Sequence, residues 1–147
     1  MGEFEYGTDG PKLILAAVDG STTSLHAGAY AVGLARRQHS ELVVITVTTT
    51  PALSGLSADA VTVLAESAQS LASDLHEQAK EYLRLLKMEA RLMTVHGDPY
   101  IEIVRAADDL RADAVVVGAS MKAGHRLVGS LAGRLIKAGK WPVTVVP

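Results

Sequence analysis

The sequence contains no cysteine, and only 4% of its 147 residues are aromatic. Without cysteine the chain can form no disulfide, no thiolate nucleophile and no zinc site with cysteine ligands. Its apolar runs are far shorter than the roughly 20 residues that cross a membrane, and the N-terminal segment is acidic where a signal peptide would be basic and then apolar. We therefore expect a cytoplasmic protein whose residues 1–10 form a disordered leader.

The chain also lacks an excess of either charge. Fourteen Lys and Arg residues stand against sixteen Asp and Glu residues, which gives a formal net charge of -2. Binding to a nucleic-acid backbone or to an anionic membrane normally needs a basic patch, so we expect no nucleic acid and no membrane as a partner. The hydrophobic content of 48% is sufficient for one compact domain, which we place at residues 11–147.

Short apolar runs alternate with amphipathic segments along the chain. The apolar runs are 12–18, 42–47, 114–117 and 143–146, and the segment 91–95 is a more polar strand of the kind found at the edge of a sheet. The spacing predicts helices at 24–39, at 58–87, after Asp98-Pro99, and from Gly129-Ser130 to about Gly139. This alternation favours an α/β fold: five parallel strands in a doubly wound sheet of order 3-2-1-4-5, Rossmann-like, with helices on both faces.

Each predicted helix has an apolar stripe that we expect to face the core, and Ser24 is expected to cap the first helix. The stripes are Leu25, Ala29, Val32 and Ala35; Val61, Leu64, Ala68, Leu71, Leu75, Ala79, Tyr82 and Leu86; Ile101, Val104 and Ala107; and Leu131, Leu135 and Ala138. The connection at 48–57 is long and rich in Thr, Ser, Pro and Gly, which fits either a functional loop or a surface linker.

Two polar loops follow strands that are neighbours in this order. Asp19-Gly20-Ser21 follows the first strand, and the segment 118–130, with Gly124, follows the fourth. In sheets of this kind ligands bind where such loops meet, beyond the carboxyl ends of the strands. A strand, a glycine-bearing loop and a helix N-terminus can receive a phosphate group. The alternative is a plain connection in which Gly129-Ser130 only caps a helix.

The residues of these loops carry no catalytic motif. The chain has no GxSxG, HExxH, GxxxxGK[ST] or GxGxxG sequence, and DGSTTS stands where ATP pyrophosphatase or nucleotidyltransferase enzymes of this architecture would have SGGxDS. Asp19 can accept hydrogen bonds from a ribose or an adenine, or it can cap a helix. Lys122 and Arg126 can offset phosphate charge or can simply be solvated. We predict no catalytic residue, no metal and no efficient enzyme.

From Lys12 to Pro147 the chain resembles the universal stress protein (UspA) family. The resemblance rests on Asp19-Gly20-Ser21, His96-Gly97-Asp98-Pro99, the segment 112–118, Gly129-Ser130 and the segment 142–146. It implies the adenine nucleotide alpha hydrolase-like fold and a small cytoplasmic dimer linked to stress or dormancy responses. In one branch of the family it also implies ATP binding through a loop of the form G-x2-G-x9-G-[ST].

This sequence departs from that loop, because Met121 stands where the second glycine belongs and the run 122–128 is two residues shorter than the pattern. The length is similar to that of the branch not expected to bind ATP. We therefore expect weak or absent ATP binding, with a smaller adenine nucleotide as the alternative ligand. A nucleotide-free interaction module that acts through protein partners is the alternative function.

The resemblance also assigns candidate nucleotide contacts by position. Asp19 would hold the adenosine and Val47 would line the base pocket, while Ala17 occupies a place where proline is common. The ribose and the phosphates would meet Gly118, Gly129, Ser130 and Leu131.

The last strand, Val143–Val146, is expected at an edge of the sheet, bracketed by Pro142 and Pro147. An apolar edge strand that nothing covers is a template for uncontrolled pairing. Two copies related by a two-fold axis can pair these strands and satisfy each other's backbone. Both this argument and the resemblance predict a homodimer through Val143–Val146; the alternative is a monomer whose short edge, bracketed by the two prolines, is tolerated.

Overall fold

The computed structural model describes residues 10–49, 55–122, 125–127 and 129–147. The expected leader, except for Gly10, therefore lies outside the described residues, as does the middle of the connection 48–57. The elements in chain order are β1 (Leu13–Ala17), α1 (Thr22–Gln38), β2 (Glu41–Thr48), α2 (Ala58–Leu85), β3 (Arg91–His96), α3 (Pro99–Leu110), β4 (Ala114–Gly118), β5 (Ser120–Lys122), β6 (His125–Leu127), α4 (Ser130–Ala138) and β7 (Val143–Val146).

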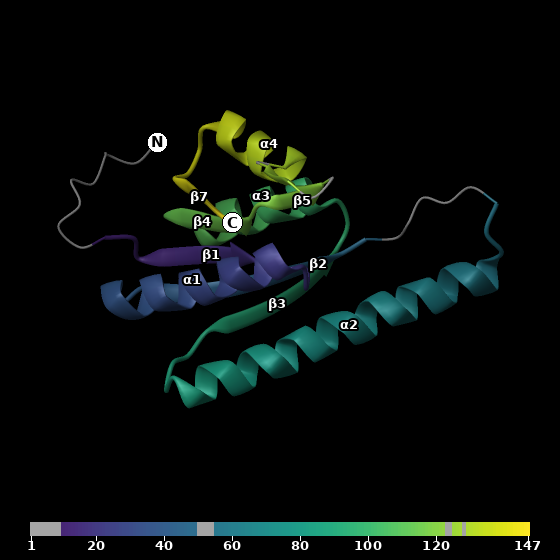
Figure 1. Ribbon diagram of the computed structural model, residues 1–147, viewed down its shortest axis with the longest axis horizontal. Coiled ribbons are helices and arrows are strands. Elements are labelled where there is room, and N and C mark those ends of the chain that lie inside the picture. The colour runs from purple at the N-terminus through teal and green to yellow at the C-terminus, as the bar shows by residue number, and fades with distance from the viewer. Residues whose placement is uncertain (1–9, 50–54, 123–124, 128) are drawn as a thin grey trace.

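Five strands form one parallel sheet in the order β3-β2-β1-β4-β7. This confirms the predicted order 3-2-1-4-5, with β7 as the fifth strand. Figure 1 shows α3 and α4 on one side of the sheet and α1 and α2 on the other. Successive strand residues face opposite sides, so Leu15 packs with the α3 and α4 core while Ile14 packs with the α1 core.

Helix α1 begins earlier and faces differently than predicted. Its N-cap is Ser21 and not Ser24, because the Ser21 hydroxyl accepts a hydrogen bond from the Ser24 N–H. Small residues, Ala27 and Ala31 among them, form the buried face and bring the helix close to the sheet. The prediction that Leu25 and Ala29 face the core is wrong, since both are exposed, whereas Val32 and Ala35 are buried as expected.

Helix α2 is longer than the sheet that it covers. Its 28 residues span about 42 Å, whereas the eight residues of β2 span about 26 Å. Its N-terminal half therefore extends past the sheet (Figure 1). The predicted core-facing stripe is wrong there, because Val61, Leu64 and Leu71 are 36%, 37% and 65% exposed. The helix contacts the core mainly through Ala72 and Leu83.

The segment after β4 also differs from the prediction. It was expected to be a loop up to Gly129, but β5 and β6 pair there as an antiparallel hairpin. Helix α4 then begins at Ser130 with Gly129 as its N-cap, as predicted. In α3 the stripe is shifted, since Ile103 and Ala106 are buried and Ile101 is exposed. In the described part of the chain, no helix has the length and apolar character that a membrane crossing needs.

Candidate functional site

A cavity of about 400 Å³ lies at the carboxyl ends of β1 and β4. Its volume falls in the range of about 300 to 1,000 Å³ that is typical of small-molecule sites. All seven of the candidate positions line this crevice: Ala17, Asp19, Val47, Gly118, Gly129, Ser130 and Leu131. Lys122 and Arg126 belong to β5 and β6, and their side chains lie outside the described part of the structure.

The crevice has an apolar wall and a polar rim. Ile45, Val117 and Ile103 from three different elements join Val47 in the wall, which suits a flat ring. The polar residues of the lining include Thr23 and Ser120, which sequence reasoning had not assigned to the site. Thr23 was detectable in principle, because it follows the DGS loop in the first turn of a helix at the switch point of the sheet.

Asp19 is held in place by the backbone that follows it. The Ser21 N–H donates to the Asp19 carboxylate at 2.9 Å, and the Asp19 N–H donates to the Ser24 hydroxyl at 3.1 Å. Burial acts to raise the pKa of the Asp19 carboxyl, but the hydrogen bonds from Ser21 and Ser24 together outweigh it and hold the pKa below its ordinary value. The carboxylate is thus an ionised hydrogen-bond acceptor at neutral pH.

Gly118 is required by a close backbone approach. A Cβ added at this residue would lie 2.5 Å from the carbonyl carbon of Thr23 and 2.6 Å from the Ser24 nitrogen. The Thr23 hydroxyl also donates to the carbonyl of Ala119, so the first turn of α1 is fastened to the chain leaving β4. The glycine that begins the loop motif therefore permits packing between α1 and β4.

Gly129 has a similar role at the other end of the hairpin. A Cβ at Gly129 would lie 2.7 Å from the Cβ of Ser120, the first residue of β5. The hairpin is thereby packed against the start of α4, beside the crevice.

The N-terminus of α4 is the best anion-accepting group in the crevice. Its N-cap, Gly129, makes no side-chain hydrogen bond, and the N–H groups of the first turn at Ser130, Leu131 and Ala132 adjoin the cavity. The positive end of the helix dipole adds to their attraction for an anion. By contrast, the N-cap residue Ser21 of α1 hydrogen-bonds to its own helix.

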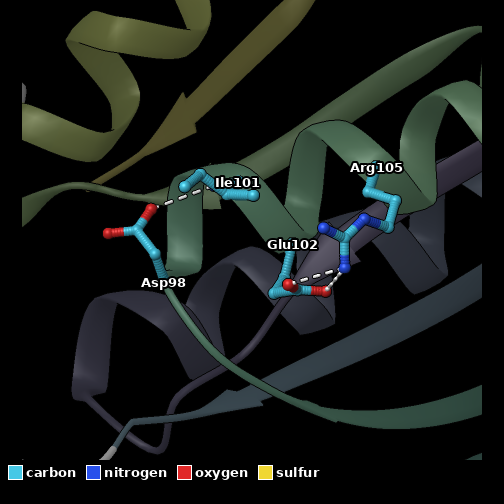
Figure 2. Close-up of polar contacts among 4 residues, drawn as sticks. All are labelled: Asp98, Ile101, Glu102 and Arg105. Atoms are coloured by element: carbon cyan, nitrogen blue, oxygen red, sulfur yellow. Dashed lines mark hydrogen bonds and ion pairs between the residues drawn. The ribbon is translucent and has the colours of Figure 1, made fainter.

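Helix α3 borders the crevice through Pro99, but the positive end of its dipole already faces the carboxylate of its own N-cap residue, Asp98. Figure 2 shows the N-cap residue Asp98, whose carboxylate accepts a hydrogen bond from the Ile101 N–H at 3.0 Å. It also shows Glu102 paired with Arg105 at 2.9 Å. Gly97, at a φ of 151°, lies under the side chain of Glu102, and an added Cβ would be 3.0 Å from the Glu102 Cγ.

The described residues contain no cluster of three side chains that could hold a metal ion.

Residues 11–147 match the family model described as the universal stress protein family. The chain belongs to this family. Universal stress protein MJ0531 of Methanocaldococcus jannaschii is 33% identical over 144 residues, a match that covers 92% of this chain and 81% of the relative.

Solved universal stress proteins share the fold of this family member. UspA from Lactobacillus plantarum superimposes with a TM-score of 0.78 at 22% identity, covering 92% of this chain and 97% of the other. A universal stress protein in complex with cAMP superimposes with a TM-score of 0.70 at 23% identity, covering 93% and 97%. These similarities confirm the Rossmann-like architecture that the alternation of strands and helices predicted.

Proposed function

We propose that this universal stress protein binds an adenine nucleotide with a single phosphate group, such as AMP or cAMP, in the crevice. It would act as a regulatory protein of the stress response and not as an enzyme. The observation that carries the proposal is the arrangement of three groups around one cavity. They are an apolar wall, the ionised Asp19 carboxylate and the α4 N-terminus without a side-chain cap.

Each group suits one part of such a nucleotide. The wall at Val47 and Ile45 suits the adenine ring, and the Asp19 carboxylate suits hydroxyl or amino donors of the nucleoside. The N–H groups at Ser130 and Leu131 suit one phosphate group. The structural neighbour in complex with cAMP is consistent with a ligand of this size, although its identity to this chain is only 23%.

The short connection between β4 and α4 disfavours ATP. The connection is two residues shorter than the ATP-binding pattern, and part of its backbone is paired between β5 and β6. Fewer N–H groups are therefore available for additional phosphates. Each charge-assisted hydrogen bond contributes roughly 1.5 to 3 kcal/mol, so the loss of two lowers ATP affinity by about a hundredfold or more. We therefore expect AMP to bind more tightly than ATP.

Isothermal titration with AMP, cAMP, ATP and adenosine tests this proposal. Ser130→Asp places a negative charge at the first position of α4, where an acid favours the helix but repels a phosphate. It should weaken AMP binding by about tenfold and leave adenosine binding unchanged. Ala58→Asp is the matched control, because it adds the same charge to the first position of α2.

Several results would contradict the proposal. ATP released in stoichiometric amounts from the heated, purified protein would show that the short connection does not exclude it. Equal AMP affinity in Ser130→Asp and the control would remove α4 from the site. Failure of every adenine nucleotide to bind a folded protein would favour the nucleotide-free interaction module, which acts through protein partners.

The absence of efficient catalysis is part of the same proposal. Asp19 is the single acidic residue among the described residues that line the crevice, and its lowered pKa makes it a weak general base. ATP or AMP turnover at the rates of ordinary enzymes, lost on Asp19→Ala, would contradict the expectation. The cytoplasmic location implied by the resemblance remains a prediction.

We also propose that the protein forms a homodimer through β7. In the described part of the chain β7 pairs with β4 alone. The carbonyls of Pro142 and Val146 accept bonds from Val115 of β4 and from Ala119 directly after it, so by alternation Val143 and Val145 direct their N–H groups to the open edge. A second β7 across a two-fold axis would accept these bonds.

A proline substitution in β7 tests the dimer interface without disrupting the fold of the monomer. Val145→Pro removes an N–H that faces the open edge, a position at which edge strands tolerate proline. Sedimentation at micromolar concentration should give a dimer for the unchanged chain and a monomer for Val145→Pro with circular dichroism preserved. A monomer for the unchanged chain, or a dimer for Val145→Pro, would contradict this interface.

A further inference from the structure

A second cavity, of about 380 Å³, lies on the other face of the sheet between α1 and α2, over β2. We call it the α1–α2 groove. Apolar residues make up most of its lining: Val18, Leu25, Ala29, Val32, Val44, Leu75, Ala79, Tyr82 and Leu83. The groove does not depend on the nucleotide proposal, because apart from Val18 it shares no lining residue with the crevice.

The groove exists because two helices leave space between them. On the side of α1 that lines it, Gly28 and Ala29 are too small to reach across to α2. Helix α2 is anchored by Leu83, which is 6% exposed, and its His76 ring bonds the Thr94 hydroxyl of β3 at 3.1 Å. Between these points Leu25 and Tyr82 remain 44% and 45% exposed beside the groove.

The charge and polarity of the lining restrict the kind of ligand. No Asp, Glu, Lys or Arg is among the residues that line the groove, so a charged ligand would lose its hydration without gaining a partner. Polar groups enter at four positions: Thr46, His76, Gln78 and the hydroxyl of Tyr82. The Nε2 atom of His76 already bonds the Thr94 hydroxyl, which leaves the Nδ1 atom of the ring to hydrogen-bond a polar group of the ligand.

We propose that the α1–α2 groove is a binding site for an uncharged, mostly apolar small molecule that carries one hydrogen-bonding group. The volume falls in the usual range of such sites, about 300 to 1,000 Å³, and an apolar lining with a few polar groups is their usual composition. The apolar body packs against Val32, Val44 and Leu75, and the polar group lies near His76.

The neutral fluorophore 1-N-phenylnaphthylamine is a suitable probe, since it has an apolar ring system and one N–H group. Titrated into the full chain, it should give a saturable rise in fluorescence. Ala79→Phe fills the groove and should weaken binding by at least about tenfold. Ala65→Phe, an exposed position on the same helix, is the matched control and should change the affinity by less than about twofold.

If Ala79→Phe does not fold, a second variant and methyl NMR of the bound probe can still test the proposal. Ala29→Phe narrows the groove from the exposed surface of α1 and should have the same effect. Methyl NMR shifts on probe addition should appear at Leu25, Val32 and Leu83. Non-saturable binding, unchanged affinity in Ala29→Phe, or shifts confined to the exposed half of α2 at Val63 and Leu71 would overturn the proposal.

Discussion

The crevice and the α1–α2 groove have nearly the same volume, about 400 and 380 Å³, but different origins. The crevice lies where strand order reverses, so backbone ends and polar loops from β1 and β4 meet there. The groove lies where a long helix passes a shorter one, so apolar side chains are left without packing partners. One cavity follows from topology, and the other follows from helix length and residue size.

The two regions also differ in how firmly they are held. Around the crevice, the first turn of α1 is in backbone contact with Gly118 and is bonded to Ala119 through Thr23. Around the groove, α2 is held by the buried side chains of Ala72 and Leu83 and by the bond between His76 and Thr94. We therefore expect substitutions at the crevice to affect the stability of the whole domain and substitutions at the groove to loosen α2 alone.

The largest expected effect on stability is that of Gly118→Ala. The new Cβ would meet the backbone of Thr23 and Ser24, which cannot move aside as a side chain could. We expect a loss of about 3 kcal/mol in the free energy of unfolding, which is at the upper end for overpacking. Urea unfolding measures it.

Gly133→Ala is the matched control for that experiment. Gly133 lies inside α4, and a Cβ there would meet nothing within 4 Å. The same substitution should raise stability by up to about 1 kcal/mol through helix propensity. A loss at Gly118 no larger than at Gly133 would mean that the contact between α1 and β4 is not rigid.

The second effect concerns the groove. Leu83→Ala removes the large buried side chain of α2 and should cost about 2 kcal/mol, the lower end for buried leucine because the site is at the surface of the core. Leu85→Ala, at a position that is 66% exposed, should cost little. Hydrogen exchange should show faster opening of α2 than of β1 in Leu83→Ala. Equal losses at the two leucines would contradict the anchoring role.

Sequence patterns predicted the crevice better than the groove. Apolar runs and turn residues identify the strands. The strand order then brings Asp19 and Ser130 to the same crevice, and this does not depend on how the side chains pack. All seven predicted positions therefore line one cavity. Their role in binding stays a prediction. Periodicity finds the stripe of α2 but does not reveal how much sheet is available to cover it, so Leu64 and Leu71 were wrongly assigned to the core.

Other misses have local causes. β5 and β6 have three residues each, too few for an alternating pattern to identify strands, so they were included in the predicted loop. For α1, apolar spacing favoured Leu25 over Ala27, whereas the short distance to the sheet selects small residues. The packing role of Gly118 was also invisible, because its contacts are with backbone distant in the sequence.

The third effect links the two cavities and rests on both proposals. Val18 lines both, and Leu75 of the groove lies beside the Asp19 loop, 3.5 Å from a Cβ placed on Gly20. A molecule packed against Leu75 should restrain this loop and tighten AMP binding about fivefold, or about 1 kcal/mol, and AMP should tighten the groove ligand equally. Titration of AMP with and without saturating 1-N-phenylnaphthylamine measures the coupling. If the coupling is unchanged in Leu75→Ala, the contact between Leu75 and the Asp19 loop does not carry it.

The smallest expected effect is a pH dependence that belongs to the crevice alone. Asp19 has a folded-state pKa below its ordinary value, which is about 3.9 in an unfolded chain. A lowered pKa means that the ionised carboxylate stabilises the fold above the unfolded pKa, and that this contribution is lost as the pH falls through the folded pKa. Asp19→Asn should therefore reduce stability slightly at pH 7, and the difference from the unchanged chain should vanish at acid pH. Leu83→Ala removes no ionisable group, so its loss should be the same throughout this pH range. Urea unfolding of the three proteins between about pH 2 and pH 7 tests this, and a stability difference for Asp19→Asn that grows as the pH falls would mean that the carboxylate is destabilising in the folded protein.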